Sequence, residues 1–251
     1  SDPTLDQAYF NRGVARARKG DNEGALNDYK QALRLNARNV EALLNRGIIF
    51  TQRKEYEAAL RDFEAESVVN PRDARAWINR GATHHMQHNF VAASQAYTQA
   101  IKLAPSEARA WAGRGGSRFF FGDVAGALAD LQQALKLNPR LALAYNQRAE
   151  IWLQQGAPGK ALADAEQAIQ YAPTMAEAWA NRGEAWFAQG QLELALADYD
   201  EALKLNSQLN QVYCNRGILH LQLQQDAAAE KDFALCQELG GILPAQTGQW
   251  L

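Results

Sequence analysis

Apolar residues between Ala176 and Asn206 recur at the spacing of two short helices. At about 3.6 residues per turn, one face of the first helix holds Trp179, Arg182, Gly183 and Trp186. One face of the second helix holds Ala195, Tyr199 and Ala202. Gln189-Gly190 separates the two helices. Because two helices of this length cannot bury their apolar faces alone, the segment is expected to stack on copies of itself.

The same pattern returns every 34 residues along the chain. The triplet that begins at Asn181 has counterparts that begin at Asn11, Asn45, Asn79, Gly113, Gln147 and Asn215. An alanine follows in phase at Ala25, Ala59, Ala93, Ala127, Ala161, Ala195 and Ala229. This register predicts seven repeats in one continuous solenoid over residues 1–251. The predicted repeats are 6–39, 40–73, 74–107, 108–141, 142–175, 176–209 and 210–243, with a C-terminal tail at 244–251.

Three further columns give the repeat its character. An aromatic column holds Tyr9, Trp77, Trp111, Tyr145, Trp179 and Tyr213, with Leu43 in the second copy. A second column holds Tyr29, Phe63, Tyr97, Leu131, Ala165, Tyr199 and Phe233, and prolines stand at Pro71, Pro105, Pro139 and Pro173. The pattern resembles the tetratricopeptide repeat. The resemblance implies an all-α fold, a right-handed superhelix (α-solenoid) of helix-turn-helix repeats that binds a protein or peptide in its concave groove.

One column departs from that family, because arginine precedes the glycine slot in all seven copies where the family usually has leucine. Aspartate recurs before the second aromatic column, at Asp28, Asp62, Asp130, Asp164, Asp198 and Asp232, while the third copy has Ala96. A ladder of Arg–Asp hydrogen-bonded pairs between neighbouring helices would explain both columns. We therefore favour a structural role for the arginines over ligand binding.

The side chains expected on the concave groove include a column of asparagines: Asn11, Asn45, Asn79, Asn181 and Asn215. A side-chain amide donates and accepts hydrogen bonds, so it can pair with a peptide backbone of any sequence. The column resembles the asparagine ladder of the O-linked N-acetylglucosamine transferase superhelix. The alternative is that these asparagines only satisfy neighbouring backbone groups.

The column is interrupted in the fourth repeat, where small residues stand beside Phe119 and Phe120, with Met86 one repeat earlier. The small residues are Ala112, Gly113 and Gly116. This combination predicts a pocket for an apolar side chain, bordered by Arg75 and Arg109. The alternative is that the phenylalanines only fill the junction between helices. Glu150, Glu177 and Glu184 lie further along the predicted groove.

Charge and composition narrow the function. The formal charge is −2, which gives no electrostatic footprint for nucleic acid, and no apolar run predicts a membrane span. Residues 1–125 carry 18 Lys and Arg against 14 Asp and Glu, whereas residues 126–251 carry 8 against 14. This asymmetry allows head-to-tail self-association. The first residue is Ser1 and not Met, so the compartment stays open; the cytoplasm is favoured, and an exported form is a second possibility.

Reactive residues give little support for an enzyme. His84, His85 and His88 include an i, i+4 pair, but no nearby carboxylate or thiol completes a metal site. We expect no cofactor, no metal and no catalytic residue. With only Cys214 and Cys236 present, a disulfide is not expected, and Cys214 is placed on a different kind of face from Cys236. The favoured function is a scaffold or adaptor that binds an extended peptide; the alternatives are a self-assembling scaffold and the recognition part of a larger enzyme.

Overall fold

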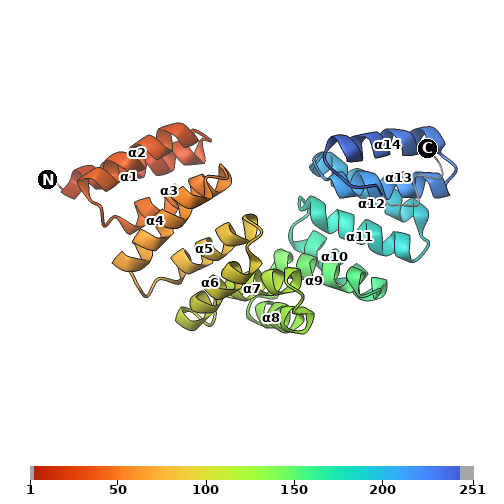
Figure 1. Ribbon diagram of the computed structural model, residues 1–251, viewed down its shortest axis with the longest axis horizontal. Coiled ribbons are helices and arrows are strands. Elements are labelled where there is room, and N and C mark those ends of the chain that lie inside the picture. The colour runs from red at the N-terminus through yellow and green to blue at the C-terminus, as the bar shows by residue number, and fades with distance from the viewer. Residues whose placement is uncertain (1–2, 244–251) are drawn as a thin grey trace. The chain divides into compact units, whose positions relative to one another are not determined.

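The computed structural model describes residues 3–243, which contain fourteen α-helices and no strand (Figure 1). The predicted all-α fold of seven helix pairs is confirmed, and the predicted tail at 244–251 lies outside the described residues. The helices are α1 (Pro3–Arg18), α2 (Asn22–Leu35), α3 (Val40–Gln52), α4 (Tyr56–Val69), α5 (Ala74–Met86), α6 (Phe90–Leu103), α7 (Ala108–Phe120), α8 (Val124–Leu137), α9 (Ala142–Gln154), α10 (Pro158–Tyr171), α11 (Ala176–Ala188), α12 (Leu192–Leu205), α13 (Asn210–Gln222) and α14 (Asp226–Glu238).

The chain divides into two compact units between Leu137 and Asn138. Unit 1 holds helices α1 to α8, the first four pairs, and unit 2 holds α9 to α14, the last three. One solenoid that spans the whole chain stays a prediction. Within each unit, the two helices of a pair pack on one another, and each second helix also packs on the first helix of the next pair.

The turn inside each helix pair has one residue in the left-handed region of backbone space. Glycine holds this position in four repeats, at Gly20, Gly122, Gly156 and Gly190. Lys54, His88 and Gln224 hold it in the other three, with φ of 63°, 58° and 58°. An L side chain is disfavoured at positive φ, so these three turns carry backbone strain that the four glycine turns lack.

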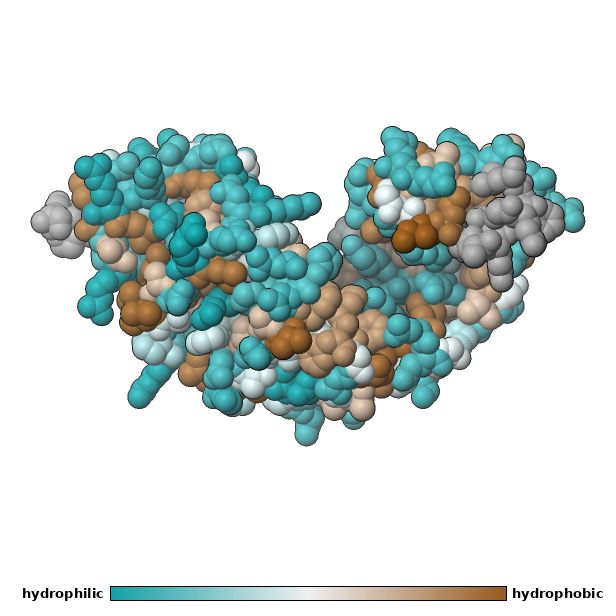
Figure 2. Space-filling view, viewed as in Figure 1, coloured by the Kyte–Doolittle hydropathy of each residue, from teal (hydrophilic) through white to brown (hydrophobic). Residues whose placement is uncertain are grey.

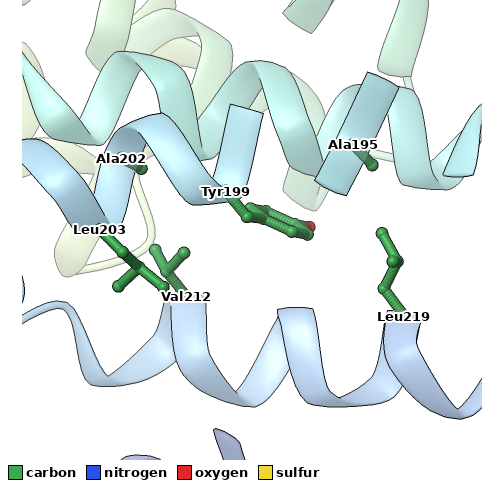
Figure 3. Packing of buried hydrophobic residues seen from close by; sticks show 6 residues of the cluster. All are labelled: Ala195, Tyr199, Ala202, Leu203, Val212 and Leu219. Carbon is green, nitrogen blue, oxygen red and sulfur yellow. The ribbon is translucent and has the colours of Figure 1, made fainter. Parts of the chain in front are cut away.

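Small residues let the two helices of a pair approach closely. All seven alanines of the in-phase column are fully buried: Ala25, Ala59, Ala93, Ala127, Ala161, Ala195 and Ala229. A Cβ atom added to Gly183 would lie 2.9 Å from Cδ1 of Tyr199. Figure 3 shows the Tyr199 ring between the two helices α12 and α13, with Val212 and Leu219 nearby. The missing side chain of the glycine therefore leaves room for the aromatic ring of the second helix to pack against the first helix.

The proline corners between pairs are tied to the first aromatic column. The indole nitrogens of Trp111 and Trp179 donate to the carbonyl oxygens of Pro105 and Pro173 at 2.8 and 2.9 Å. The Tyr145 hydroxyl reaches the Pro139 carbonyl at 3.3 Å. These bonds satisfy carbonyl groups beyond the end of the preceding helix and fix the start of the next one.

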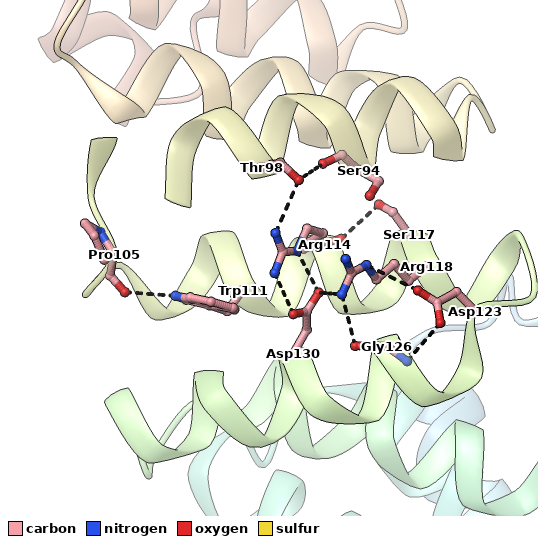
Figure 4. Close-up of polar contacts among 11 residues, drawn as sticks. Ser94, Thr98, Pro105, Trp111, Arg114, Ser117, Arg118, Asp123, Gly126 and Asp130 are labelled. Carbon is pink, nitrogen blue, oxygen red and sulfur yellow. Dashed lines mark hydrogen bonds and ion pairs between the residues drawn. The ribbon is translucent and has the colours of Figure 1, made fainter. Parts of the chain in front are cut away.

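The predicted Arg–Asp ladder is confirmed. In six repeats the arginine donates from Nε and Nη2 to both carboxylate oxygens of the aspartate sixteen residues later. Figure 4 shows Arg114 paired with Asp130, at 2.7 and 2.8 Å, and Arg118 on the same carboxylate. Hydrogen bonding from Arg12 lowers the pKa of Asp28. The arginines hold the two helices of one repeat together.

Cys214 and Cys236 correct a prediction. The structure joins them in a disulfide, with Cα atoms 5.4 Å apart, a distance typical of disulfides. Both residues are fully buried between α13 and α14, so the placement of Cys214 on a different kind of face was also wrong. Counting cysteines missed the pair because helix packing, and not their number, brings the two positions together.

Glu66 is the unusual residue of the core. It occupies the α4 position that holds Ala32 and Ala100 in the neighbouring repeats, and it is fully buried. Neither carboxylate oxygen has a hydrogen-bond partner within the described part of the chain. Burial, followed by the negative charge of Asp73, raises the pKa of Glu66 to about 7. The second repeat therefore buries a carboxyl group in a position that holds alanine in its neighbours.

Candidate functional site

A pocket of about 200 Å³ in unit 1 brings together four of the predicted site residues: Asn45, Asn79, Arg75 and Arg109. Its other lining residues are Glu41, Leu44, Ile48 and Ile78. These side chains come from helices α3, α5 and α7, the first helices of three successive repeats. We call this site the α3–α7 pocket. The 34-residue period builds it, because Glu41, Arg75 and Arg109 are equivalent positions.

The two arginines of the α3–α7 pocket differ in how many carboxylates bind them. Arg75 donates to both carboxylate oxygens of Glu41, at 3.1 and 2.7 Å, and to Asp73 at 2.9 Å. These hydrogen bonds, that to Asp73 first, raise the pKa of Arg75. Arg109 has a side chain that is 68% exposed, and its Nε donates to Glu107 at 3.1 Å. The open cation of the pocket is therefore Arg109, while Arg75 is held by two carboxylates.

The apolar part of the pocket consists of Leu44, Ile48 and Ile78. Leu44 is buried, whereas Ile48 is 38% exposed. A second pocket of about 420 Å³ also includes Arg75 and Ile78 in its lining. Its other lining residues are Asn70, Arg72, Asp73, Ala74, Ala104 and Glu107. The sequence missed Leu44 and Ile48 as site residues, although the step of 34 residues from Ile78 to Leu44 could have indicated the first.

The asparagine column of unit 1 is only partly engaged. Asn11 accepts a hydrogen bond from Gln7 at 3.0 Å, and Asn45 donates to the Glu41 carbonyl at 2.7 Å. For Asn79 no side-chain hydrogen bond forms within the described residues, and the residue lines the α3–α7 pocket. This amide is thus available to a ligand.

In unit 2 the same column joins neighbouring helices. The Asn181 amide donates to the backbone carbonyl and side-chain oxygen of Asn146, at 3.3 and 3.0 Å. Asn215 accepts from Gln211 at 2.9 Å and donates to Glu184 at 3.5 Å. Burial raises the pKa of Glu150 and of Glu184, and the charge of Glu184 adds to the shift of Glu150. In unit 2 the amides therefore form hydrogen bonds within the protein, which agrees with the alternative that these asparagines only satisfy neighbouring groups.

The predicted apolar pocket in the fourth repeat is filled. Ala112 and Gly116 are buried, and a Cβ atom on Gly113 would overlap the ring of Tyr97 from α6. The small residues therefore accommodate this ring. The prediction of a pocket at Gly113 was wrong because the sequence does not show which side chain of a neighbouring helix enters the space.

The aromatic residues beside that position form a surface cluster in unit 1. Phe120 is 50% exposed, and its ring stacks on Phe90 with centroids 4.5 Å apart. Phe119 lies 5.5 Å from Phe120 by the same measure, and His85 meets both Phe90 and Phe120 edge-on. Met86 is 45% exposed. Figure 2 shows hydrophobic patches among hydrophilic residues on one face of the protein.

The helix pairs and their paired columns define a helical repeat protein. Models of the tetratricopeptide repeat match residues 74–107, 176–209 and 117–172, and a further TPR repeat model matches residues 15–52. The chain belongs to the tetratricopeptide repeat family. The first two matched segments coincide with the predicted third and sixth repeats.

Solved structures agree with this assignment. The APC/C hetero-tetramer Cut9-Hcn1 gives a TM-score of 0.78 at 18% identity over 84% of this chain and 42% of that one. A tetratricopeptide repeat protein from Parabacteroides merdae gives 0.73 at 19% identity over 94% of both chains. MamA from Desulfovibrio magneticus gives 0.54 at 19% identity, covering 66% of this chain and 94% of that one. At these identities the likeness shows the fold. No curated protein matches the sequence significantly.

The family and the fold support a scaffold for protein–protein interaction as the general class, since tetratricopeptide repeat proteins are generally non-catalytic scaffolds. Among the helices in residues 3–243, none combines the length and apolar character needed to cross a membrane.

Proposed function

We propose that unit 1 binds an extended peptide segment of a protein partner along helices α3, α5 and α7. The α3–α7 pocket takes an aliphatic side chain of the peptide between Ile48 and Ile78. The observation that carries the proposal is the pairing of this half-open apolar pocket with an uncommitted amide, that of Asn79. A pocket for one anchor side chain beside a group for the backbone is how extended peptides are commonly held.

The polar residues of the pocket suggest the sequence of the peptide. Arg109 is the exposed cation at the pocket, so an acidic residue next to the aliphatic anchor is favoured. Arg75 is already neutralised by Glu41 and Asp73 and contributes shape more than charge. Asn11 and Asn45 extend the site on one side. Met86 and Phe120, which are exposed, and the partly buried Phe119 extend it as an apolar surface for a second, larger side chain.

The proposal assigns unit 2 a smaller part. Asn181 and Asn215 are held by Asn146 and Glu184, so a peptide that reached them would first have to displace internal hydrogen bonds. We therefore expect peptide binding to depend on unit 1 residues and to tolerate Asn181→Ala and Asn215→Ala.

The test is a set of binding measurements with one labelled peptide, selected against the whole protein from a random library. Ile78→Asp should weaken binding by at least about tenfold, because it places a charge in the apolar pocket. Asn79→Ala should weaken it by about fivefold, the value of one hydrogen bond. Leu194→Asp is the matched control, since Leu194 is 48% exposed on α12 in unit 2. Equal affinity of the wild type and Ile78→Asp would reject the α3–α7 pocket as the peptide site.

A further inference from the structure

The third repeat breaks the Arg–Asp ladder. In the other six repeats, two aspartate oxygens accept hydrogen bonds from the arginine Nε and Nη2 atoms at 2.6 to 2.9 Å. In the third repeat the arginine is Arg80, and the position of the aspartate is taken by Ala96. A methyl side chain offers no hydrogen-bond acceptor, so Arg80 lacks the carboxylate partner that the other six arginines have.

Arg80 nevertheless stacks on an aromatic ring of its own helix, as Arg114 does. Its guanidinium carbon lies 4.5 Å from the centroid of the Trp77 ring, as that of Arg114 lies 4.9 Å from Trp111. Within the described residues, Arg80 forms no salt bridge and its buried Nε atom has no hydrogen-bond partner. Stacking on an aromatic face orders the guanidinium in advance, which favours binding of an anion.

His84 adds a second group to this position. One turn after the repeated arginine, the equivalent residues of other repeats also reach the aspartate. Arg118 contacts Asp130 at 3.0 Å and Trp152 contacts Asp164 at 3.1 Å. The Nδ1 atom of His84 is buried and, among the described residues, has no hydrogen-bond partner. Burial lowers the pKa of His84, a side-chain hydrogen bond with Gln87 opposes this shift, and the nearby charge of Arg80 adds to it. Two nitrogen atoms thus lack the acceptor that the other repeats supply.

We propose that Arg80 and His84 form a receptor for a carboxylate that comes from outside the chain. The planar guanidinium edge formed by Nε and Nη2 matches a carboxylate bidentately, as the six internal pairs demonstrate. The group that Ala96 lacks, relative to aspartate, is a single carboxylate, so the receptor takes a formate-sized group. Such a group is supplied by a free short-chain carboxylate or by the acidic side chain of a protein partner.

One internal carboxylate is a competitor. Arg114 and Arg216 use Nη1 to reach Thr98 and Asp200 on the preceding helix, at 3.3 and 2.6 Å. The residue equivalent to Thr98 and Asp200 for Arg80 is Glu64 of α4, which is exposed and does not pair with Arg80. Because Glu64 would approach the Nη1 edge and not the Nε edge, Glu64→Gln should leave the receptor intact.

The test compares melting temperatures in sodium formate and in sodium chloride at equal ionic strength. Formate should raise the melting temperature of the wild type and of Glu64→Gln by about 2–4 °C above chloride, and should not do so for Arg80→Gln. Ala96→Asp should melt higher than the wild type in chloride and lose the formate response. Asp28→Ala is the matched control: it should create a second receptor at Arg12 and gain an additional formate response.

A second arm separates the two sources of the carboxylate. An acetylated and amidated hexaglutamate peptide is titrated into the wild type and Arg80→Gln by calorimetry. Binding that is lost in Arg80→Gln supports an acidic side chain of a partner as the ligand. A formate response without peptide binding supports a free short-chain carboxylate. The proposal is overturned if formate acts equally on the wild type and Arg80→Gln, if neither probe acts on the wild type, or if Ala96→Asp lowers the melting temperature.

Discussion

The asparagine column behaves differently in the two units. In unit 1 Asn79 and Leu44 line the same pocket, and no side chain of the described residues forms a hydrogen bond with the Asn79 amide. In unit 2 the amide of Asn181 is bonded to Asn146. The difference comes from the residue 35 positions earlier, which is an asparagine in unit 2 and a leucine in unit 1. A repeated residue thus takes its role from its neighbour in the preceding repeat.

The same contrast extends to the residues around each column. Unit 1 surrounds it with aliphatic side chains and two guanidinium groups, and unit 2 with amides and the carboxyl groups of Glu150 and Glu184. Unit 1 has an open surface of mixed character, and unit 2 has an internally bonded one. Reciprocal substitutions at equivalent positions of the two units provide direct tests of this contrast.

The largest effect is expected at the alanine slot that holds Glu66 in unit 1 and Ala168 in unit 2. The folded-state pKa of Glu66, about 7, lies above its usual value of 4.5, so its protonated form contributes stability below pH 4.5 that is lost as the pH rises through 7. Glu66→Ala should therefore stabilise unit 1 by about 3 kcal/mol at pH 8 and by less at pH 5. Ala168→Glu should destabilise unit 2 at pH 8. Hydrogen exchange of peptides from each unit measures both; an equal gain at the two pH values would contradict the titration of Glu66.

A smaller effect is expected at the left-handed turn position. Lys54→Gly should stabilise unit 1 by about 1 kcal/mol, because glycine adopts positive φ without strain. The reciprocal change in unit 2, Gly190→Lys, should destabilise it by a similar amount. Urea denaturation followed by hydrogen exchange assigns each change to its unit. No change in either variant would mean that φ at this turn is not a source of strain.

Substituting the asparagine by alanine should change the free energy of unfolding of the two units by amounts that differ by about 1 kcal/mol. Asn181→Ala should destabilise unit 2 by about that amount, since it removes the hydrogen bonds to Asn146. Asn79→Ala should leave the stability of unit 1 unchanged. The same urea experiment measures both variants, and an equal loss in the two would remove the distinction drawn between the columns.

The smallest effect concerns the carboxyl pair of unit 2. Burial raises the pKa of Glu150 and the charge of Glu184 raises it further, so Glu184→Gln should lower the pKa of Glu150 toward its ordinary value. Carbon-13 NMR titration of the Glu150 carboxyl group measures this shift. An unchanged titration curve would show that the two charges do not interact.

The repeat architecture could be predicted from the sequence because seven copies in strict register constrain one another. The Arg–Asp ladder followed from two columns in fixed phase. The positive φ of Lys54 could not be predicted from the sequence, because lysine, unlike glycine, gives no local signal of this conformation.

The site was predictable only in part. Arg75, Arg109, Asn45 and Asn79 do line one pocket. The tie between Arg75 and Glu41 and the filling of the space at Gly113 by Tyr97 were missed, because both depend on which side chains of neighbouring repeats meet. The disulfide between Cys214 and Cys236 lies within the seventh repeat and was missed for another reason, because only that copy has cysteine at these two positions. Contacts between residues that recur in every copy follow from the period, whereas contacts between residues that differ from copy to copy do not.

The position of the Arg–Asp pairs has a consequence for changes in length. Each pair closes within its own hairpin, sixteen residues apart, and each guanidinium in these pairs has a carboxylate partner in its own copy, although Arg216 also pairs with Asp200 of the preceding one. A hairpin of this kind can be duplicated or deleted as a block without stranding a buried charge in its neighbours. The exception is the third hairpin, whose transplantation would carry an unpaired cation to every new location.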